Sequence, residues 1–295
     1  MSKCGFELRA PLENAARNEI LDSLITVTPL INGRGNVSLF AIAKPSLPMP
    51  RKRDWPLVGL NFLPEACVGL GLLVNEARLG RDESVLDIGC GFGRMAYVLS
   101  YYLSPTCRYE GLEPVGRWVR WNRRILGSRF RNFRFTELPV RNSVYNTKGK
   151  LKATSVRFPY PDATFDLAFA TSVFQHNQAA VVRHYLSEIA RVLRPGGRSL
   201  ITCFLLDAKP PRRPFENGSS SFPYALKDCW TVNPDLPETG IAFLESDFRG
   251  WAADNDLSVL RKLSGSWQGP GRSNLYQDML ILKKPGAVRR ASRVV

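Results

Sequence analysis

One stretch of the sequence combines an acid, three glycines and the start of a helix. The apolar run Val85–Ile88 contains Asp87, and Gly89, Gly91 and Gly93 follow it at alternate positions. Glycine has no Cβ, so a ligand can approach its backbone closely, and the first turn of a helix offers N–H groups that lack intrahelical partners. This succession of strand, glycine turn and helix predicts a binding site for a nucleotide-like ligand.

A second acid stands at the end of the next predicted strand. Glu113 follows the strand predicted over residues 107–112, about 20 residues after the glycines. An acid at this offset can accept hydrogen bonds from ribose hydroxyls. Residues 91–96 also fit the dinucleotide pattern GxGxx(G/A), so the glycines alone leave a dinucleotide open as the ligand. The position of Asp87 before the glycines, and the lack of a second pyrophosphate-type loop, favour a different nucleotide.

The elements around these residues alternate between strands and amphipathic helices. Helices are predicted over residues 64–79, 92–103, 118–126, 182–193 and 247–255, and strands over 84–88, 107–112, 130–136, 165–173, 198–206, 257–263 and 277–284. Such alternation is typical of an α/β fold with a doubly wound, mostly parallel sheet. Ligands of such sheets bind outside the carboxyl ends of the strands, which is where the glycine turn is expected.

The composition limits the possible partners and compartments. The chain has 41 Lys and Arg against 26 Asp and Glu, a net charge of +15, which favours an anionic partner. Its six cysteines form no CxxC pair, so neither a zinc site nor a disulfide framework is predicted. The sequence has no apolar run of membrane-spanning length and no signal-like start. We therefore expect a soluble, cytoplasmic protein without a metal.

Four short motifs occur in a fixed order across residues 64–284. They are VLDIGCGFG at residues 85–93, EGLEP at 110–114, FPYPDATFD at 158–166 with the run to His176, and RVLRPGG at 191–197. Together they resemble the motifs of the class I, Rossmann-like S-adenosylmethionine-dependent methyltransferases. Four concordant motifs are far more specific than one glycine loop.

The resemblance implies a seven-stranded sheet of order 3-2-1-4-5-7-6 with an antiparallel last strand. It also implies S-adenosylmethionine as the cofactor. Glu113 would hold the ribose diol, Pro114 or Val115 would flank adenine, and Glu137 is a candidate for the acid expected after strand three. The complete set of implied cofactor-binding residues is Asp87, Gly89, Cys90, Gly91, Gly93, Glu113, Pro114, Ser172 and Val173.

Methyl transfer needs a base to take the proton of the acceptor, and the chain has only two histidines. His176 follows strand four at its carboxyl end, so it is the candidate catalytic base. An orienting or packing role for His176 is the alternative. His184 lies opposite the apolar stripe of its helix and is expected to be solvent-exposed. Glu245 and Asp247 are further candidate bases.

The resemblance also divides the chain. Residues 1–60 are predicted to form an N-terminal extension or cap, 61–284 the methyltransferase domain, 207–245 a lid over the acceptor and 285–295 a basic tail. The acceptor is expected to be a small molecule or a saccharide, methylated at oxygen in a biosynthetic pathway.

Three alternatives remain open. An RNA methyltransferase could use the arginines between residues 117 and 134, and a scaffold could bind the cofactor without catalysis. A homodimer is a further possible assembly. The arginines in question are Arg117, Arg120, Arg123, Arg124, Arg129, Arg131 and Arg134.

Overall fold

The computed structural model describes residues 24–27, 39–42, 47–50, 62–208, 222–269 and 275–286. The chain forms two compact units. The first unit comprises residues 1–83 and 90–137, and the second comprises residues 84–89 and 138–295, in both cases as far as they are described.

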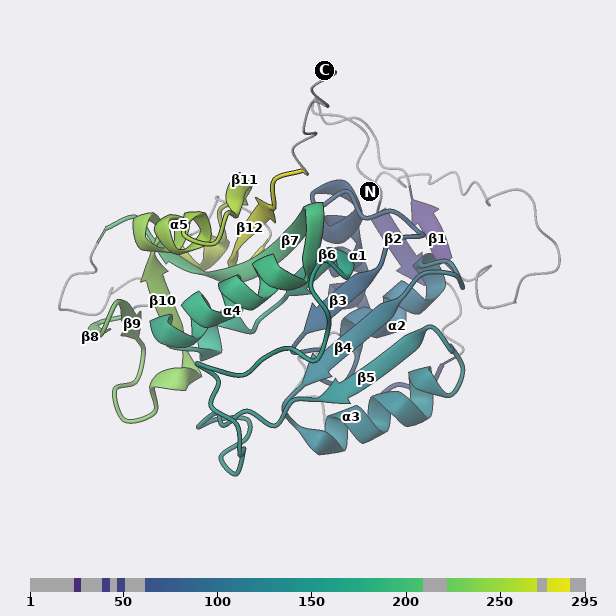
Figure 1. Cartoon of the computed structure of the whole chain (residues 1–295), viewed down its shortest axis with the longest axis horizontal. Coiled ribbons are helices and arrows are strands. Elements are labelled where there is room, and N and C mark those ends of the chain that lie inside the picture. The colour runs from purple at the N-terminus through teal and green to yellow at the C-terminus, as the bar shows by residue number, and fades with distance from the viewer. Residues whose placement is uncertain are drawn as a thin grey trace, which may run out of the picture. The chain divides into compact units, whose positions relative to one another are not determined.

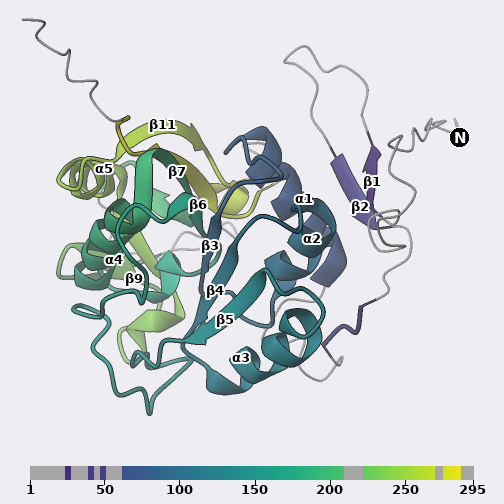
Figure 2. The same cartoon turned by 45° about the vertical axis from the view of Figure 1, so that its right-hand side comes forward.

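The first unit contains the helix that follows the glycine turn and two parallel strands. Figure 2 shows α1 beside α2, and α3 beside β5. Strands β4 and β5 pair in parallel, and strands β1 and β2 form an antiparallel pair. The elements are β1 (Leu24–Val27), β2 (Leu39–Ile42), α1 (Phe62–Asn75), α2 (Arg94–Tyr102), β4 (Tyr109–Glu113), α3 (Gly116–Asn122) and β5 (Phe133–Glu137).

The second unit contains most of the strands. Figure 1 shows α4 running alongside β7. Its main elements are β3 (Val85–Ile88), β6 (Phe165–Ala170), α4 (Ala179–Val192), β7 (Leu193–Leu206), α5 (Glu245–Ala253), β11 (Ser258–Leu263) and β12 (Asp278–Lys283).

The topology of the described strands confirms the predicted fold class. The hydrogen-bonded order is β5-β4-β3-β6-β7, and β7 also pairs with β12, which in turn pairs with β11. The pairs β4–β5, β3–β6 and β6–β7 are parallel. Strand β12 runs antiparallel to β7, with Leu280 opposite Ile201. This is the predicted order 3-2-1-4-5-7-6 with an antiparallel last strand.

The apolar patterns of the sequence coincide with the buried positions. In β6, every residue except Asp166 is buried, as expected for a parallel strand covered on both faces. In α2, the buried residues include Met95, Ala96 and Leu99, as expected for an amphipathic helix with one apolar face. Burying a side chain as large as that of Met95 or Leu99 contributes about 1.5–3 kcal/mol, so these buried faces stabilise the packing of the helices against the sheet.

Several element boundaries differ from the sequence prediction by a few residues, and three of these differences alter the local structure. Strand β6 ends at Ala170 rather than 173, because Ser172 adopts a left-handed φ of 58° that extended backbone cannot continue. Strand β7 begins at Leu193 rather than 198, and its pairing with β6 shifts register at this start. The Pro-Gly-Gly sequence is therefore a bulge within β7 and not a separate turn. Helix α3 ends at Asn122 and continues as a π-helical turn, η3 (Arg123–Gly127).

The insertion after β7 adds strands that the sequence pattern does not predict. Strand β10 pairs in parallel with the end of β7, and β9 and β8 follow it in antiparallel order. Its described elements are β8 (Tyr224–Leu226), β9 (Cys229–Thr231), η5 (Pro237–Thr239) and β10 (Ile241–Leu244). Residues 209–221 lie outside the described part, as do most of residues 1–60 and the tail from 287, so the predicted cap, lid and tail stay predictions.

Candidate functional site

In the first unit, the glycine turn is closed by a set of short hydrogen bonds. The N–H of Cys90 donates to the carbonyl of Leu112 over 2.9 Å, and the N–H of Gly93 donates to the carbonyl of Cys90 over 2.8 Å. The N–H of Gly91 donates to Oε2 of Glu113 over 2.8 Å. These contacts bring four of the sequence-predicted cofactor residues together, namely Cys90, Gly91, Gly93 and Glu113.

Two glycines of this turn have left-handed backbones but different surroundings. Gly91 has φ of +54°, and a Cβ added to it would meet no atom within 4 Å. Gly93 has φ of +75°, and its Cβ would lie 2.4 Å from Oδ1 of Asn122. Gly93 is therefore required by packing, whereas Gly91 leaves open space beside the backbone. Such space is what a closely bound ligand would need.

Glu113 ends β4 and is only 2% exposed. Its Oε1 accepts a hydrogen bond from the N–H of Val115 over 2.9 Å, while Oε2 accepts from Gly91. A carboxylate can accept about four hydrogen bonds, so these two backbone bonds are compatible with a ribose diol that donates to the same group. Pro114 follows directly after the strand, as the resemblance implies for a residue flanking adenine.

Sequence analysis missed Asn122, which supports the same turn. Its Nδ2 donates to the carbonyl of Gly91 over 2.8 Å, and the residue is fully buried on α3. Within the described part of the chain, its Oδ1 has no hydrogen-bond partner. An asparagine on the buried face of a helix was the available signal, because buried amides need partners. Glu137, the other implied acid, lies at the end of β5 against Gly116.

In the second unit, the predicted cofactor residues lie at the ends of β3 and β6. Asp87 in β3 is 1% exposed. Gly89 has φ of +74°, and the Cγ2 of Val173 occupies the space beside it. Ser172 is exposed, its N–H donates to Oγ1 of Thr202 over 2.8 Å, and its hydroxyl donates to Gln277. Gly89 and Val173 are thus in direct contact.

Substituting Gly89 by alanine is expected to lower the free energy of unfolding by about 2–5 kcal/mol. Its Cβ would lie 2.5 Å from Cγ2 of Val173, and the left-handed φ adds strain. In the double variant Gly89→Ala/Val173→Ala, the smaller side chain at position 173 should relieve the clash but not the backbone strain. Urea denaturation should therefore show a smaller loss of stability than the sum of the two single variants. A double variant whose losses simply add would contradict this account.

His176 lies in a short 3-10 turn, η4 (Phe174–His176), where three segments of the second unit meet. Its Nδ1 is 2.8 Å from the carbonyl oxygen of Glu238 in η5. Its Nε2 is 3.1 Å from the hydroxyl of Tyr145 and 3.3 Å from Nε2 of Gln175. Asn142 Nδ2 donates to the carbonyl of His176 over 2.9 Å. His176 is therefore held on both its ring and its backbone.

This environment favours the neutral imidazole. Burial lowers the pKa of His176 below the ordinary value of 6.5, and outweighs the hydrogen bond to the Glu238 carbonyl and the charge of Glu238, which raise it. A neutral imidazole can accept a proton at neutral pH. The arrangement can thus act as a general base.

The other candidate bases are less suited to that role. Burial raises the pKa of the Glu245 carboxyl, but hydrogen bonds from Lys262 and Arg249 outweigh it and hold the pKa below its usual range. Asp247 lies in the first turn of α5. His184 is only partly exposed, contrary to the prediction, because its Nε2 donates to the carbonyl of Val156 over 2.7 Å.

The predicted arginine surface lies in the first unit on α3, η3 and β5. Residues 114–136 contain seven arginines and no acidic residue. All seven side chains are exposed, and none forms an ion pair with a described residue. Arg124 lies over the ring of Trp121. We call these residues the arginine surface, namely Arg117, Arg120, Arg123, Arg124, Arg129, Arg131 and Arg134.

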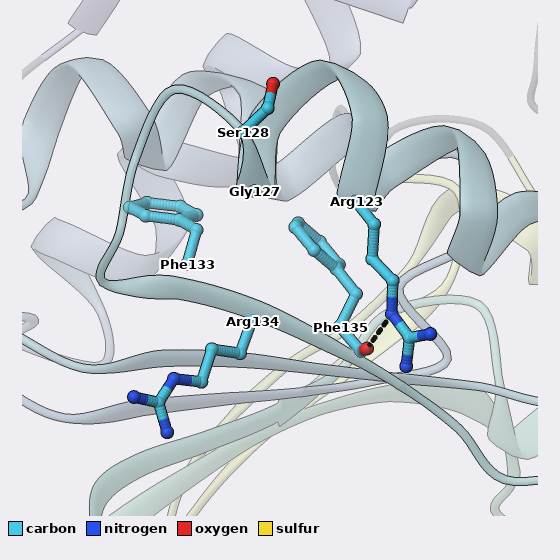
Figure 3. Close-up of a pocket in the computed structure, with 6 residues that line it drawn as sticks. All are labelled: Arg123, Gly127, Ser128, Phe133, Arg134 and Phe135. Carbon is cyan, nitrogen blue, oxygen red and sulfur yellow. Dashed lines mark hydrogen bonds between the residues drawn. The ribbon is translucent and has the colours of Figure 1, made fainter.

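A cavity of about 320 Å³ opens within the arginine surface. Figure 3 shows Phe133 and Phe135 pointing from β5 toward the helix, whereas Arg134 points to the other side of the strand. Nε of Arg123 donates to the carbonyl of Phe135 over 2.8 Å. The remaining lining residues are Gly127 and Ser128.

No group of three or more His, Cys, Asp or Glu side chains in this part is placed to hold a metal ion. No helix described in the structure combines the length and the apolar character needed to cross a membrane.

Parts of this chain are similar to known proteins. Residues 86–201 match the family model described as "Methyltransferase domain". A tRNA (carboxymethyluridine(34)-5-O)-methyltransferase of Saccharomyces cerevisiae is 26% identical over 182 residues, covering 59% of this chain and 49% of the relative. An O-methyltransferase of Aspergillus nomiae is 31% identical over 135 residues, covering 44% of this chain and 51% of the relative. The chain spans about half the length of the curated relatives it matches.

A solved structure shares the fold. The PH0226 protein of Pyrococcus horikoshii has a TM-score of 0.53 at 16% identity, covering 79% of this chain and 97% of that chain. The matched family model starts within β3 and ends within β7, so it includes the glycine turn, Glu113 and His176.

Proposed function

Because the domain in residues 86–201 belongs to the class I, Rossmann-like S-adenosylmethionine-dependent methyltransferases, we propose that this chain methylates a hydroxyl group of a small-molecule or saccharide acceptor. The observation that carries this proposal is the neutral imidazole of His176, whose Nδ1 is engaged by a backbone carbonyl. The chemical result is an imidazole nitrogen, Nε2, that can receive the proton of a hydroxyl. All described cysteines are free thiols, which supports a cytoplasmic location.

The residues of the glycine turn fit the cofactor. We propose that Gly91 and Gly93 let it approach the backbone, that Glu113 accepts hydrogen bonds from its ribose, and that Asp87 faces its amino acid part. The open space beside Gly91 and the buried carboxylate of Glu113 support this assignment. When bound, S-adenosylmethionine supplies an electrophilic methyl group on a sulfonium centre.

The contribution of the chain to the reaction is positioning and proton removal. Aligning the acceptor with the methyl group avoids the entropy loss of a bimolecular encounter. His176 takes the proton from the acceptor hydroxyl, which raises the nucleophilicity of the oxygen. Glu238 holds the imidazole ring in place through its carbonyl group.

The proposal is tested by incubating the full chain with S-adenosylmethionine that carries a labelled methyl group and with a panel of phenols, alcohols and saccharides. Label is expected in at least one organic product as a methyl ether stable to mild base. Binding of the cofactor by calorimetry, with no transfer to any acceptor class including RNA, would instead support a non-catalytic scaffold. Label in a base-sensitive methyl ester would instead show that the chain methylates a carboxyl group of the acceptor.

RNA is a second candidate acceptor, and the arginine surface is the observation that favours it. An exposed set of arginines without acidic partners attracts a polyphosphate backbone. The described large apolar side chains that are exposed all lie outside residues 114–136. The similarity to a tRNA methyltransferase supports the same candidate.

Reversing three charges on the arginine surface is expected to weaken RNA binding at least about tenfold and to reduce the salt slope by about 2, near 0.7 for each lost phosphate contact. The variant Arg120→Glu/Arg131→Glu/Arg134→Glu changes exposed side chains that form no ion pair with a described residue. A single-stranded RNA of 20 nucleotides, followed by fluorescence anisotropy across salt concentrations, measures both quantities.

The matched control reverses three exposed lysines elsewhere, Lys148, Lys150 and Lys152. Equal losses in the two triple variants would mean that RNA responds only to net charge. The arginine surface would then have no role as a specific site.

A further inference from the structure

Tyr145 contacts the proposed base, although nothing in the sequence pattern assigns it a role. Its hydroxyl lies 3.1 Å from Nε2 of His176, and the two rings meet edge to face with centroids 4.9 Å apart. Tyr145 belongs to the polar segment between β5 and β6, where residues 138–157 interrupt the alternation of strands and helices. The contact therefore joins the inserted segment 138–157 to η4, the short turn that follows β6.

The direction of this hydrogen bond follows from the other side of the ring. The carbonyl oxygen of Glu238 can only accept, so Nδ1 of His176 carries the ring proton. In the neutral imidazole, Nε2 then carries a lone pair and must accept. Its two neighbours, the Tyr145 hydroxyl and the Gln175 amide nitrogen, are both able to donate.

Exposure decides which of these groups can meet an acceptor molecule. Gln175 is 5% exposed, and His176 is only partly exposed, whereas Tyr145 is 36% exposed. Both ring nitrogens of His176 are engaged, one by Glu238 and one by Tyr145. An acceptor that approaches from solvent therefore encounters the phenol before it encounters the imidazole.

The position of Tyr145 is built by the same segment. Oδ1 of Asn142 accepts a hydrogen bond from the N–H of Tyr145 over 2.9 Å, and Nδ2 of Asn142 donates to the carbonyl of His176 over 2.9 Å. One asparagine side chain thus links the backbones of the tyrosine and the histidine. Both Ser143 N–H and Ser143 hydroxyl donate to Oε2 of Glu238, which joins this segment to η5.

We propose that Tyr145 contacts the acceptor hydroxyl and passes its proton to His176. This inference rests on the proposed function. The O–H bond of the acceptor breaks as its proton bonds to Oη of Tyr145, and the original phenolic proton bonds to Nε2 of His176. The acceptor oxygen keeps the electron pair for its new bond to the methyl carbon, whose bond to sulfur breaks. The positive charge ends on the imidazolium, with Nδ1–H still donated to the Glu238 carbonyl.

Among the described residues, two with titratable side chains contact His176 or act on its charge. Tyr145 comes from the 138–157 segment, and Glu238 comes from η5. The Glu238 carboxylate, held by Ser143, is the group placed to stabilise the imidazolium that forms.

The first test needs no acceptor and uses the full chain labelled with nitrogen-15 in its two histidines. The structure assigns opposite tautomers, with the proton on Nδ1 in His176 and on Nε2 in His184, because each of these nitrogens faces a carbonyl oxygen. Tyr145→Phe should shift the Nε2 resonance of His176 and leave His184 unchanged. An Nε2–H tautomer at His176, or an unchanged resonance in the variant, would overturn the relay.

The second test uses the acceptor found in the labelled-methyl panel. Tyr145→Phe is expected to lower kcat by at least about 100-fold, the lower range for general-base catalysis. The affinity for S-adenosylmethionine should stay within about twofold. Tyr276→Phe, which changes a phenol that is 57% exposed elsewhere, should leave kcat unchanged.

The outcomes separate the two proposals. If the wild-type chain methylates no acceptor, the proposed function fails. If the wild-type chain is active and Tyr145→Phe keeps full kcat, the acceptor meets His176 directly and the relay is wrong. A kcat that falls together with a changed pH profile, while the unfolding transition stays in place, supports the relay over a structural role.

Discussion

Gly91→Val is expected to weaken S-adenosylmethionine binding by at least about 100-fold while the chain stays folded. A Cβ on Gly91 would meet no protein atom within 4 Å, so the side chain would project into the open space beside the turn. The loss follows if that space belongs to the cofactor, because a filled space excludes the ligand. The left-handed φ of +54° adds a strain of about 1–3 kcal/mol to the folded state.

Gly196→Val is the matched control for this experiment. Gly196 also has a left-handed backbone, with φ of +81°, and no atom within 4 Å of an added Cβ, but it lies in the bulge at the start of β7. Both variants should lose similar stability in thermal unfolding, and only Gly91→Val should lose binding in calorimetry. Equal affinities for the two variants would show that the space beside Gly91 is not the binding site.

Replacing His176 by glutamine should reduce methyl transfer by about 10²–10⁴-fold, the usual contribution of a general base. Cofactor binding should be retained, because the loss concerns proton removal. Glutamine keeps a polar side chain of similar size, which limits the effect on packing. The second histidine provides the control, since His184→Gln should leave the rate unchanged.

The pH profile of the wild-type chain provides a second measurement on the same residue. The base acts in its deprotonated form, so the rate should rise with pH through the pKa of His176. Burial lowers that pKa below 6.5, so the plateau should be reached at a lower pH than an ordinary histidine would allow. A rate that keeps rising well above neutral pH would point to another base.

Local patterns were sufficient to predict the glycine turn and the position of Glu113 at the end of a strand, whereas the strand order followed from the resemblance to a known family. The turn and Glu113 depend on residues close in sequence or on a standard offset between adjacent strands, and periodicity reports which faces are buried. Cofactor and catalytic roles for these residues stay predictions. Strand β7 was misplaced because its bulge is defined by pairing with β6, which no local pattern contains.

The surroundings of His176 could not be predicted for the same reason. Tyr145 lies 31 positions before His176, and Glu238 lies 62 positions after it. Each comes from an insertion whose path depends on contacts with other parts of the second unit. Asn122 is similar, since its partner Gly91 is 31 positions away.

The two insertions that meet at His176 also affect the order in which two parts of the molecule form during folding, the glycine turn and the surroundings of His176. The glycine turn is completed by Glu113, 22 positions after Gly91. The protonation pattern of His176 requires both distant insertions to have docked, and contacts of long sequence separation are slow to form. Under the proposed roles, a chain that is still folding would therefore become able to hold its cofactor before it becomes able to activate an acceptor. Damage to either insertion alone would leave the glycine turn formed and the surroundings of His176 incomplete.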